Sequence, residues 1–329
     1  MNKNNKILVT GCAGFIGFHL VNKLCSQGYT VIGIDNINDY YDVDLKKSRL
    51  NELNPHVKSG QFIFYKEDIV NLEKIEKLFK IDGINYVIHL AAQAGVRYSL
   101  ENPHAYIQSN VVGFMNILEC CRHNKINNLI YASSSSVYGG NKKIPFSEDD
   151  RVDSPISIYA ATKKSNELMA YTYSHLYNIN TIGLRFFTVY GPWGRPDMSP
   201  HIFTASILNN EKIKLFNNGE HTRSFTYIDD IIESIYRLID SDELQLKKYL
   251  LLNIGGGDSI QLMDYIKLIE KSLSKQAKYD FLPRCYAEME KTSASTNQLF
   301  DLTGYAPKIK IKEGIPRFVK WYLEYYNMY

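Results

Sequence analysis

The sequence predicts an α/β protein built on a doubly wound parallel sheet, with a smaller mixed α/β lobe. Short apolar runs alternate with helical patterns through the first half of the chain, as in parallel sheets with helices on both faces. A glycine-rich turn follows the first apolar run, and a serine run follows the fifth, at the edge where such sheets bind ligands. The predicted strands are residues 6–10, 30–34, 62–65, 86–90, 129–132, 181–185, 214–216 and 251–254. The predicted helices include residues 71–79, 103–122, 157–177, 201–208, 231–239 and 259–273.

The bulk composition narrows the class of protein. The chain has 329 residues, of which 45% are hydrophobic and 22% charged, and its net charge is +3. Such values are ordinary for a globular protein, and the small charge predicts neither nucleic acid nor a membrane surface as a partner. No apolar run reaches membrane-spanning length. The five cysteines lack metal-ligand spacing, so we expect a cytoplasmic protein with reduced thiols and no metal site.

The first predicted strand leads into Gly11-Cys12-Ala13-Gly14-Phe15-Ile16-Gly17. Strand, glycine turn and helix in this order are typical of a Rossmann dinucleotide-binding unit. Gly11 would make the tight turn, Gly14 would let the backbone approach a pyrophosphate, and Gly17 would let the helix pack on the strand. The start of the helix would carry the phosphate charge. We therefore assign to cofactor binding Gly11, Gly14, Phe15 and Ile16.

The second predicted strand ends in Asp35. A carboxylate there accepts both ribose hydroxyls of an adenosine and repels a 2′-phosphate, which favours NAD over NADP. A turn or a helix cap is the alternative role for Asp35. After the third strand, Asp68 either reaches the adenine amino group or caps the helix that follows. Asn36 and Ile69, beside these two acids, are included in the predicted cofactor site.

Small residues follow the fourth predicted strand and let a backbone pass close to a ligand. We expect His89, at the end of that strand, to be a core histidine rather than a base. In the next helix, Asn110 either lies at the surface or reaches toward the cofactor. The fifth strand delivers Ser133 to the ligand edge. The predicted cofactor contacts from this part of the chain are Leu90, Ala91, Ala92, Gln93, Asn110 and Ser133.

Tyr159 precedes Lys163 by four residues in a predicted helix, so both side chains lie on one helical face. A tyrosine has an ordinary pKa of about 10, and a neighbouring ammonium lowers that pKa by stabilising the phenolate. Such a tyrosine can take a proton from a sugar hydroxyl. The pair alone is weak evidence, because most such pairs lie on solvated surfaces. The predicted topology brings it into one crevice with the glycine turn and the serine run.

Together these features resemble the extended short-chain dehydrogenases/reductases, in particular the NAD-dependent nucleotide-sugar epimerases and dehydratases. The resemblance covers nearly the whole chain. It is closest to the UDP-glucuronate 4-epimerases, and the matching stretches are residues 89–99, 131–139 and 184–198.

This resemblance implies roles for the residues of the crevice. Tyr159 would be the acid–base residue, Lys163 would hold the nicotinamide ribose and lower the tyrosine pKa, and Ser134 would bond the sugar 4-hydroxyl. Related dehydratases carry an Asp-Glu pair where this chain has Ser135-Ser136. Elimination of water would therefore lack its acid and base. The residues expected around the sugar, including its carboxylate, are Ser135, Ser136 and Thr188.

The remaining predicted contacts come from the segments around the sugar nucleotide. Arg195, in a Gly- and Pro-rich loop, contacts the diphosphate or the sugar acid, or is a surface cation. Arg223 is a good diphosphate clamp because a guanidinium is a fixed donor fork. Relatives usually carry Pro-Gly-Asp where this chain has Tyr286-Ala287-Glu288, and Glu288 still offers a ribose acceptor. We add Phe186 to the cofactor site and, to the substrate site, Arg97, Ser99 and Phe216.

The sequence thus predicts an NAD-binding domain at residues 1–190, which carries the catalytic residues, and a substrate lobe at 191–329 with excursions back to the first domain. The expected reaction is 4-epimerisation of a nucleotide sugar, UDP-glucuronate above all, for surface polysaccharide precursors. The alternatives are a UDP-glucuronate decarboxylase, an epimerase of another nucleotide sugar, and a non-catalytic NAD-binding sensor or scaffold. The resemblance also implies a homodimer through helices 103–122 and 157–177.

Overall fold

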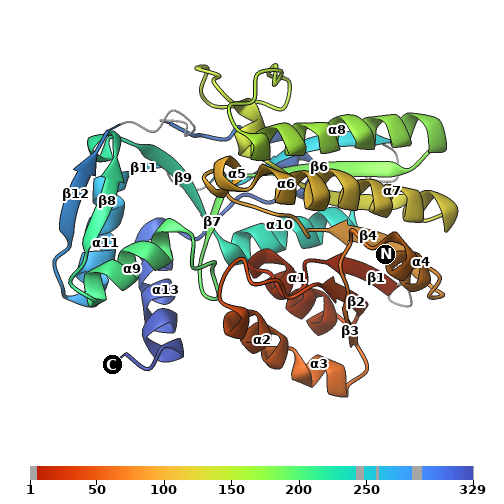
Figure 1. Ribbon diagram of the computed structural model, residues 1–329, viewed down its shortest axis with the longest axis horizontal. Helices are drawn as coiled ribbons and strands as arrows, with labels where there is room; N and C mark the ends of the chain where they lie inside the picture. Colours follow the sequence, from red (N-terminus) through yellow and green to blue (C-terminus); the bar gives the residue numbers. More distant parts are fainter. Residues whose placement is uncertain (1–5, 242–247, 257–258, 284–290, 329) are drawn as a thin grey trace.

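The computed structural model describes residues 6–241, 248–256, 259–283 and 291–328 (Figure 1). A seven-stranded sheet lies at its centre, and every neighbouring pair of strands in it is parallel. The predicted doubly wound parallel sheet is confirmed. From edge to edge the strands are β10 (Tyr249–Ile254), β6 (Asn180–Phe186), β5 (Asn128–Ser134), β4 (Ile84–His89), β1 (Lys6–Thr10), β2 (Thr30–Asp35) and β3 (Phe62–Lys66).

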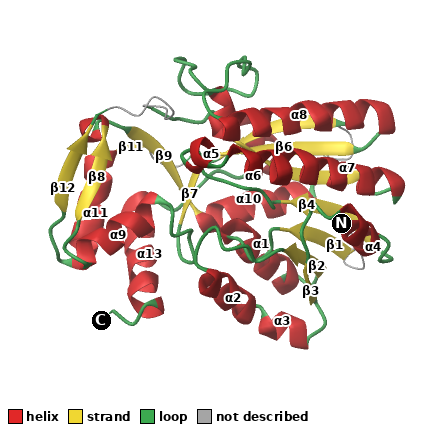
Figure 2. Ribbon diagram, viewed as in Figure 1, coloured by secondary structure: helices red, strands yellow, loops and turns green. Residues whose placement is uncertain are grey.

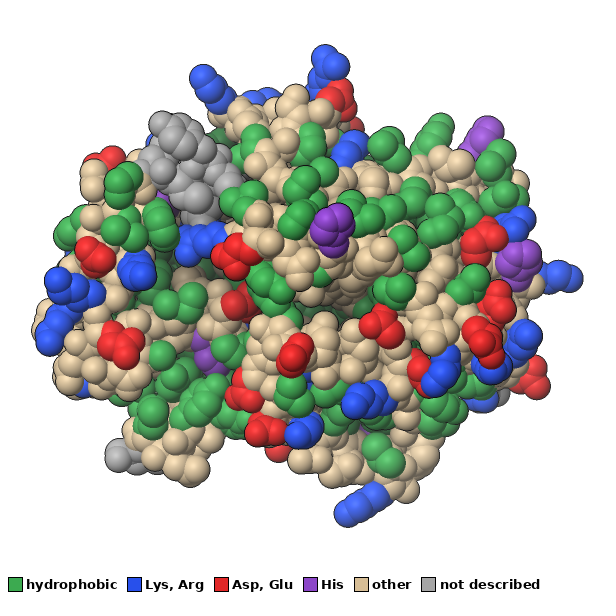
Figure 3. All heavy atoms as spheres, viewed as in Figure 1, with side chains coloured by type: hydrophobic (Ala, Val, Ile, Leu, Met, Phe, Trp, Pro, Cys, Tyr) green, Lys and Arg blue, Asp and Glu red, His purple; other side chains and the backbone are tan. Residues whose placement is uncertain are grey.

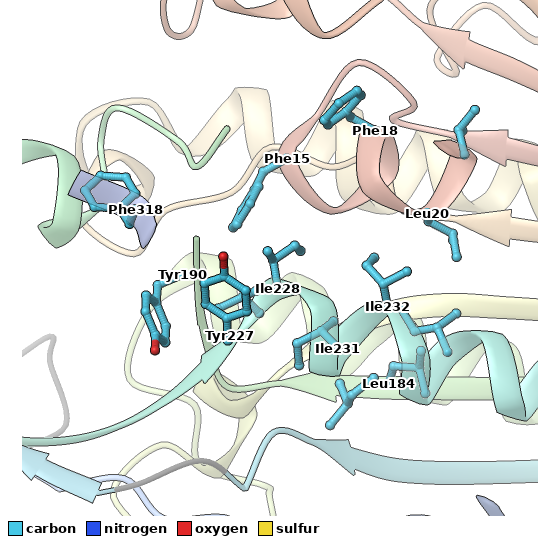
Figure 4. Close-up of a cluster of buried hydrophobic side chains, with 14 of the residues drawn as sticks. Phe15, Phe18, Leu20, Leu184, Tyr190, Tyr227, Ile228, Ile231, Ile232 and Phe318 are labelled. Carbon is cyan, nitrogen blue, oxygen red and sulfur yellow. The ribbon is translucent and has the colours of Figure 1, made fainter. Parts of the chain in front are cut away.

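Helices cover both faces of this sheet (Figures 1 and 2). On one face α1 (Phe15–Ser26) packs against α10 (Ile228–Asp240). Figure 4 shows Phe18 and Leu20 of α1 and Ile232 of α10 in this cluster of buried side chains. The other face carries α4 (Leu72–Phe79), α7 (Gly113–His123) and α8 (Ile158–Tyr177), whose apolar residues form a second buried cluster. Two covered faces explain why the strands are almost uniformly apolar.

Shorter helical segments connect these layers. They are α2 (Val43–Glu52) and α3 (Asn54–Lys58) after β2, then α5 (Tyr98–Glu101), α6 (Pro103–Tyr106) and the π-helical segment η1 (Ile107–Val112) before α7, and the 3₁₀ segment η2 (Ser135–Tyr138) after β5.

A separate set of elements lies to the left of the large sheet in Figure 1. It contains a three-stranded sheet of order β11-β9-β7 and a parallel pair, β12 and β8. The boundary at residue 190 stays a prediction, and β10 returns from the second half of the chain to the large sheet. The elements are β7 (Thr188–Tyr190), α9 (Ser199–Leu208), β8 (Lys212–Phe216), η3 (Asn217–Gly219), β9 (Thr222–Tyr227), β11 (Ser259–Gln261), α11 (Leu262–Leu273), β12 (Lys278–Leu282) and α13 (Ile311–Tyr325). The helix α12 (Asn297–Thr303) instead contacts α10 and β10 of the larger part.

Two predicted helices differ from those observed. The helix predicted at 103–122 is interrupted by the π-helical segment η1, a feature frequent at functional sites. The helix predicted at 259–273 begins only at Leu262, because residues 259–261 pair with β9 as an antiparallel strand. Within the described ranges, no helix is long and apolar enough to cross a membrane.

Candidate active site

Three loops meet at the carboxyl edge of the large sheet. Thr10 of β1 pairs with His89 of β4, and His89 pairs with Tyr131 of β5. Beyond these strands the chain enters the glycine turn, the small-residue run at 90–95 and the serine run. Because neighbouring parallel strands end at one edge, these three segments lie together, as the sequence predicts.

The glycine turn has no room for side chains. Gly11 has φ +73°, and a Cβ atom there would lie 2.7 Å from the backbone nitrogen of Ala91. A Cβ atom on Gly17 would lie 2.0 Å from the carbonyl oxygen of Gly11, so α1 packs directly on the end of the strand. Gly14 precedes α1, and no side chain caps that helix. The N-terminus of α1 therefore has free backbone N–H groups next to glycines without side chains, an arrangement that fits the pyrophosphate of a dinucleotide.

Asp35 lies at the end of β2, next to this turn. Its carboxylate accepts hydrogen bonds from the backbone N–H groups of Ala13 at 3.1 Å and Ile37 at 2.9 Å. Burial raises the pKa of Asp35, and these hydrogen bonds oppose that effect. A carboxylate has about four acceptor positions, so Asp35 retains capacity for ribose hydroxyls. It does not cap the next helix, because Asp42 caps α2.

Asp68 lies beside Asn36, whose side-chain nitrogen donates to it at 2.8 Å. The second Asp68 oxygen accepts from the backbone N–H of Val70 at 2.9 Å. The alternative that Asp68 caps α4 is wrong, because the side chain of Asn71 caps that helix. Ile69 is 5% exposed and packs in the core, so it offers a ligand little beyond its backbone.

The predicted cofactor contacts divide into exposed and buried side chains. Phe15 is buried and points from the start of α1 toward Tyr190 and Tyr227 (Figure 4), so only its backbone faces the turn. Partly exposed residues at the sheet edge are Ile16, Leu90, Ala91, Ala92 and Phe186.

Asn110 connects the loop after β4 to α8. Its side chain accepts from the backbone N–H of Gln93 at 2.8 Å and donates to the Gln93 carbonyl at 3.0 Å and to the Thr162 hydroxyl at 3.0 Å. Asn166 of α8 donates to the Asn110 carbonyl at 2.6 Å. Asn110 is 1% exposed, so the surface alternative is wrong. The residue lies in the π-helical segment and positions the loop that carries Gln93.

Tyr159 stands in the first turn of α8, which is capped by the Ser157 hydroxyl. Burial raises the pKa of Tyr159, whereas a hydrogen bond with Ser134 and the charge of Arg195 oppose that rise. Lys163 is 2% exposed, and its ammonium donates to the carbonyl of Ala132 at 2.8 Å. Burial lowers the pKa of Lys163 to about 7. Ser134 and Arg195 thus oppose the rise in the tyrosine pKa, and the lowering expected from Lys163 stays a prediction.

A buried ionic network lies beneath the serine run. The Ser133 hydroxyl donates to Glu167 at 2.7 Å, so this side chain faces the protein interior. Arg185 of β6 forms two hydrogen bonds with the same carboxylate, at 2.8 and 3.0 Å. Both charged side chains are at most 1% exposed. The network holds β5, β6 and α8 together directly behind Ser134 and Tyr159.

The other serines of the run and one cation, Arg97, belong to the predicted substrate side of the site. Ser134 accepts from the backbone N–H of Ser136 at 3.1 Å and from its hydroxyl at 2.9 Å. Ser135, Ser136 and Thr188 are partly exposed. Arg97 lies over the ring of Phe216, 4.5 Å from its centroid, which brings together two predicted substrate contacts from distant segments.

Four other predicted substrate residues have distinct surroundings. Arg195 is bonded to Asp197 at 3.0 Å and is mostly buried, so the surface-cation alternative is wrong. Arg223 is partly exposed on β9 and donates to the carbonyl of Thr222 at 3.3 Å. Ser99 is completely buried, and its hydroxyl donates to the Val96 carbonyl at 2.6 Å. This side chain therefore does not reach the substrate surface, in contrast to the prediction. Glu288 lies outside the described residues.

His89 and Asp230 have structural partners. The His89 ring bonds the Thr10 hydroxyl at 2.8 Å, and burial lowers its pKa to about 3, so it is a neutral core histidine as predicted. Asp230 accepts from Tyr305 at 2.6 Å and lies in the first turn of α10. Among the described residues, no group of three or more His, Cys, Asp or Glu side chains is arranged to hold a metal ion.

The family model described as the NAD dependent epimerase/dehydratase family matches residues 7–255, which include the glycine turn, the serine run, Tyr159 and Lys163. The chain belongs to this family. The predicted resemblance to NAD-dependent nucleotide-sugar epimerases is confirmed.

Relatives of this epimerase/dehydratase family member cover its whole length. Protein CapI of Staphylococcus aureus is 50% identical, over 98% of this chain and 99% of that protein. A probable UDP-glucuronate 4-epimerase of Rhizobium meliloti is 43% identical, over 98% of both. A solved UDP-glucuronic acid 4-epimerase from Bacillus cereus, in complex with UDP-glucuronic acid and NAD, is 34% identical with a TM-score of 0.90, covering 98% of this chain and all of that one.

The epimerase/dehydratase site also contains residues that the sequence did not indicate. Tyr40 donates to Asp197 at 3.1 Å, and a Cβ atom on Gly95 would lie 2.7 Å from the Tyr40 hydroxyl. The ring of Tyr106 lies 6.0 Å from that of Tyr159. Tyr40 and Asp197 come from loops far apart in the sequence and Tyr106 ends α6, so no local pattern relates these residues to Tyr159.

Proposed function

We propose that this chain is a UDP-glucuronate 4-epimerase, which interconverts UDP-glucuronate and UDP-galacturonate by transient oxidation at C4. The observation that carries the proposal is the hydrogen bond between Tyr159 and Ser134, which ends β5 at the same sheet edge as the glycine turn. The names of the full-length relatives and the ligands of the Bacillus cereus structure support the substrate.

NAD fits the residues at the sheet edge. The uncapped start of α1 would hold the pyrophosphate, Asp35 the adenosine ribose, and Lys163 the nicotinamide ribose. When bound, NAD supplies a reversible hydride acceptor for C4. The small residues around Gly11 let the cofactor lie close to the backbone.

Tyr159 would take the proton from the sugar 4-hydroxyl and later return it to the same oxygen. Its phenolate is stabilised by Ser134 and by the positive charge of Arg195. Ser134 would also hold the sugar oxygen at hydrogen-bond distance, so that proton transfer needs little rearrangement. Inversion requires that the oxidised sugar turns over between the two hydride transfers while its diphosphate stays bound, for which Arg223 is the proposed anchor.

The side chains around the sugar favour epimerisation over the elimination of water and the loss of carbon dioxide. Ser135 and Ser136 stand where an acid–base pair would be needed to eliminate water. The 4-keto form of a uronate is a β-keto acid, which can lose carbon dioxide. Hydroxyl donors from Ser135, Ser136 and Thr188 would hold the carboxylate in an orientation that limits this loss.

Purified protein incubated with UDP-glucuronate and NAD should form UDP-galacturonate. Nuclear magnetic resonance of the product distinguishes the hexuronate epimer from a pentose, because the pentose lacks the carboxylate carbon. A UDP-pentose product would identify a decarboxylase. Turnover of other UDP-, GDP- or CDP-linked sugars without turnover of UDP-glucuronate would identify another epimerase, and no turnover of any would favour a non-catalytic NAD-binding protein.

We further propose that two copies associate through α8 and the preceding helical segments. Leu168, Tyr171 and Leu176 lie on α8 and are 58%, 56% and 59% exposed. Leu100 and Ile107 add exposed apolar surface nearby, and Figure 3 shows hydrophobic side chains across this face. A face of this kind commonly marks a protein interface.

Sedimentation should show a homodimer, and a Leu168→Glu variant should shift it toward the monomer because a charge would be buried in the interface. Phe300→Glu changes a side chain that is 52% exposed on α12, away from this face, and is the matched control. A monomeric wild type, or equal dissociation of both variants, would refute the interface.

We also propose a cytoplasmic enzyme that supplies precursors of surface polysaccharide. The cysteines of the described ranges, Cys12, Cys25, Cys120 and Cys121, are buried free thiols, which suits a reducing compartment.

A further inference from the structure

Arg49 of α2 is a charged side chain with 0% exposure. It donates to the carbonyl of Ala13 at 2.9 Å and to the Tyr41 hydroxyl at 2.7 Å. It also donates to the carbonyl of Trp193 at 3.1 and 2.7 Å and to that of Gly194 at 3.1 Å. All five hydrogen bonds end on uncharged oxygens, so ion pairing does not explain why this guanidinium is buried.

The carbonyl acceptors of Arg49 belong to two loops with different tasks. Ala13 lies inside the glycine turn, directly before Gly14. Trp193 and Gly194 lie about 180 residues further along the chain, in the loop that follows β7. A single planar group thus connects the cofactor turn with the loop on the substrate side.

The loop after β7 leads directly to the reacting groups. Arg195 follows Gly194, is bonded to Asp197, and its charge acts on Tyr159. Trp193 has φ +63°, a left-handed conformation that a side chain other than glycine rarely adopts. The loop therefore needs contacts from outside to keep this shape. Arg49 bonds the carbonyls of both Trp193 and Gly194, and His201 also bonds the Gly194 backbone.

A second contact joins the same two parts of the site. The His19 ring of α1 bonds the carbonyl of Pro192 at 3.0 Å through Nε2. Burial lowers the pKa of His19 to about 4, so the neutral ring donates at neutral pH. The ring of Phe18 also packs edge-on against Trp193 at 5.6 Å. The helix that begins at the pyrophosphate site thus also contacts the substrate loop.

We infer that Arg49 is a positioning residue that couples the cofactor turn to the substrate loop, so that a bound dinucleotide favours the loop position that places Arg195 beside Tyr159. This inference rests on the proposed function for the identity of the two ligands. The guanidinium is suited to it because its donors form a rigid fork that spans several acceptors. A lysine has one charged nitrogen and cannot reach both loops in the same geometry.

The coupling is measured from binding constants. The affinities for NAD and for UDP, a ligand that is not turned over, are determined by calorimetry for each alone and for UDP in the presence of saturating NAD. In the wild type, NAD should tighten UDP binding by about tenfold, within the usual range for coupled sites. In Arg49→Lys this ratio should fall to near one, and the dissociation constant for NAD should rise on the order of tenfold.

Ser48→Ala is the matched control. Ser48 is the preceding residue of α2, and its hydroxyl accepts a hydrogen bond from Tyr325 of α13 at 3.1 Å. The variant weakens the packing of the same helix but leaves both loop contacts, so its NAD affinity and coupling ratio should equal those of the wild type. His19→Phe retains a ring but removes the donor to Pro192, and should lower the ratio even if Arg49→Lys does not fold.

A ratio near one in the wild type overturns the inference. A wild-type ratio in both Arg49→Lys and His19→Phe does so as well, as does an equal loss in Ser48→Ala. Failure of the proposed substrate is seen separately, because the wild type would then bind UDP weakly or leave UDP-glucuronate unchanged. The NAD affinities of Arg49→Lys and Ser48→Ala still decide the role of Arg49 in that case.

Discussion

A Tyr159→Phe variant should turn over UDP-glucuronate about 10²–10⁴-fold more slowly than the wild type, the usual contribution of a positioned acid–base group. The substitution removes the phenol hydroxyl, which is bonded to Ser134 and is acted on by the charge of Arg195. Lys163 cannot replace Tyr159 as the acid–base group, because its buried ammonium donates a hydrogen bond to the carbonyl of Ala132. The value of kcat is measured by stopping the reaction at set times and quantifying the product. Calorimetry should show that the variant binds NAD with an affinity within a few-fold of the wild type.

Tyr106→Phe is the matched control for this experiment. It deletes a hydroxyl from the neighbouring ring, 6.0 Å from Tyr159, and that hydroxyl donates to the carbonyls of Ala94 at 3.0 Å and Gly95 at 2.5 Å. We expect less than a tenfold change in kcat, because one neutral hydrogen bond contributes about 1 kcal/mol. Undiminished turnover by Tyr159→Phe, or an equal loss in both variants, would contradict the acid–base assignment.

A Glu167→Gln variant should lose about 3–5 kcal/mol of unfolding free energy, because it leaves the charge of Arg185 buried without its counter-ion. The two side chains are at most 1% exposed and share two hydrogen bonds. A guanidinium stays protonated in proteins, so Arg185 cannot avoid this cost by losing its proton. Urea unfolding followed by circular dichroism measures the change.

Glu119→Gln provides the comparison. Glu119 pairs with Arg122 on α7 at 2.8 Å, but these side chains are 29% and 33% exposed. Exposed ion pairs contribute about 0–1 kcal/mol to the free energy of unfolding. We therefore expect Glu167→Gln to lower this free energy several-fold more than Glu119→Gln does. A loss below about 1 kcal/mol for Glu167→Gln would show that the buried network does not stabilise the fold as argued.

Local sequence patterns predicted the elements of the site well. The order of strand, glycine turn and helix at residues 6–26 depends on steric limits of the backbone, and a Cβ atom at Gly11 or Gly17 would meet another backbone atom, as expected. The spacing of Tyr159 and Lys163 follows from the helical repeat. The parallel order of the sheet follows from alternating strands and helices with right-handed connections.

Partners across long sequence distances were predicted poorly. The sequence assigned Arg195 to the diphosphate or the sugar acid, and the structure shows that its charge also acts on Tyr159. The strand at 259–261 was predicted as helix because its pairing with β9 is not visible in local periodicity.

The sequence by itself determined the sheet, the dinucleotide turn and the face that carries Tyr159, because steric limits and periodicity act over a few residues. Only the tertiary structure decided that Arg49 contacts both the cofactor turn and the loop at 193–194, and that Asn110 holds the loop of Gln93. Such contacts depend on how loops separated by many residues pack, and a carbonyl acceptor has no signature in the sequence because every residue carries one.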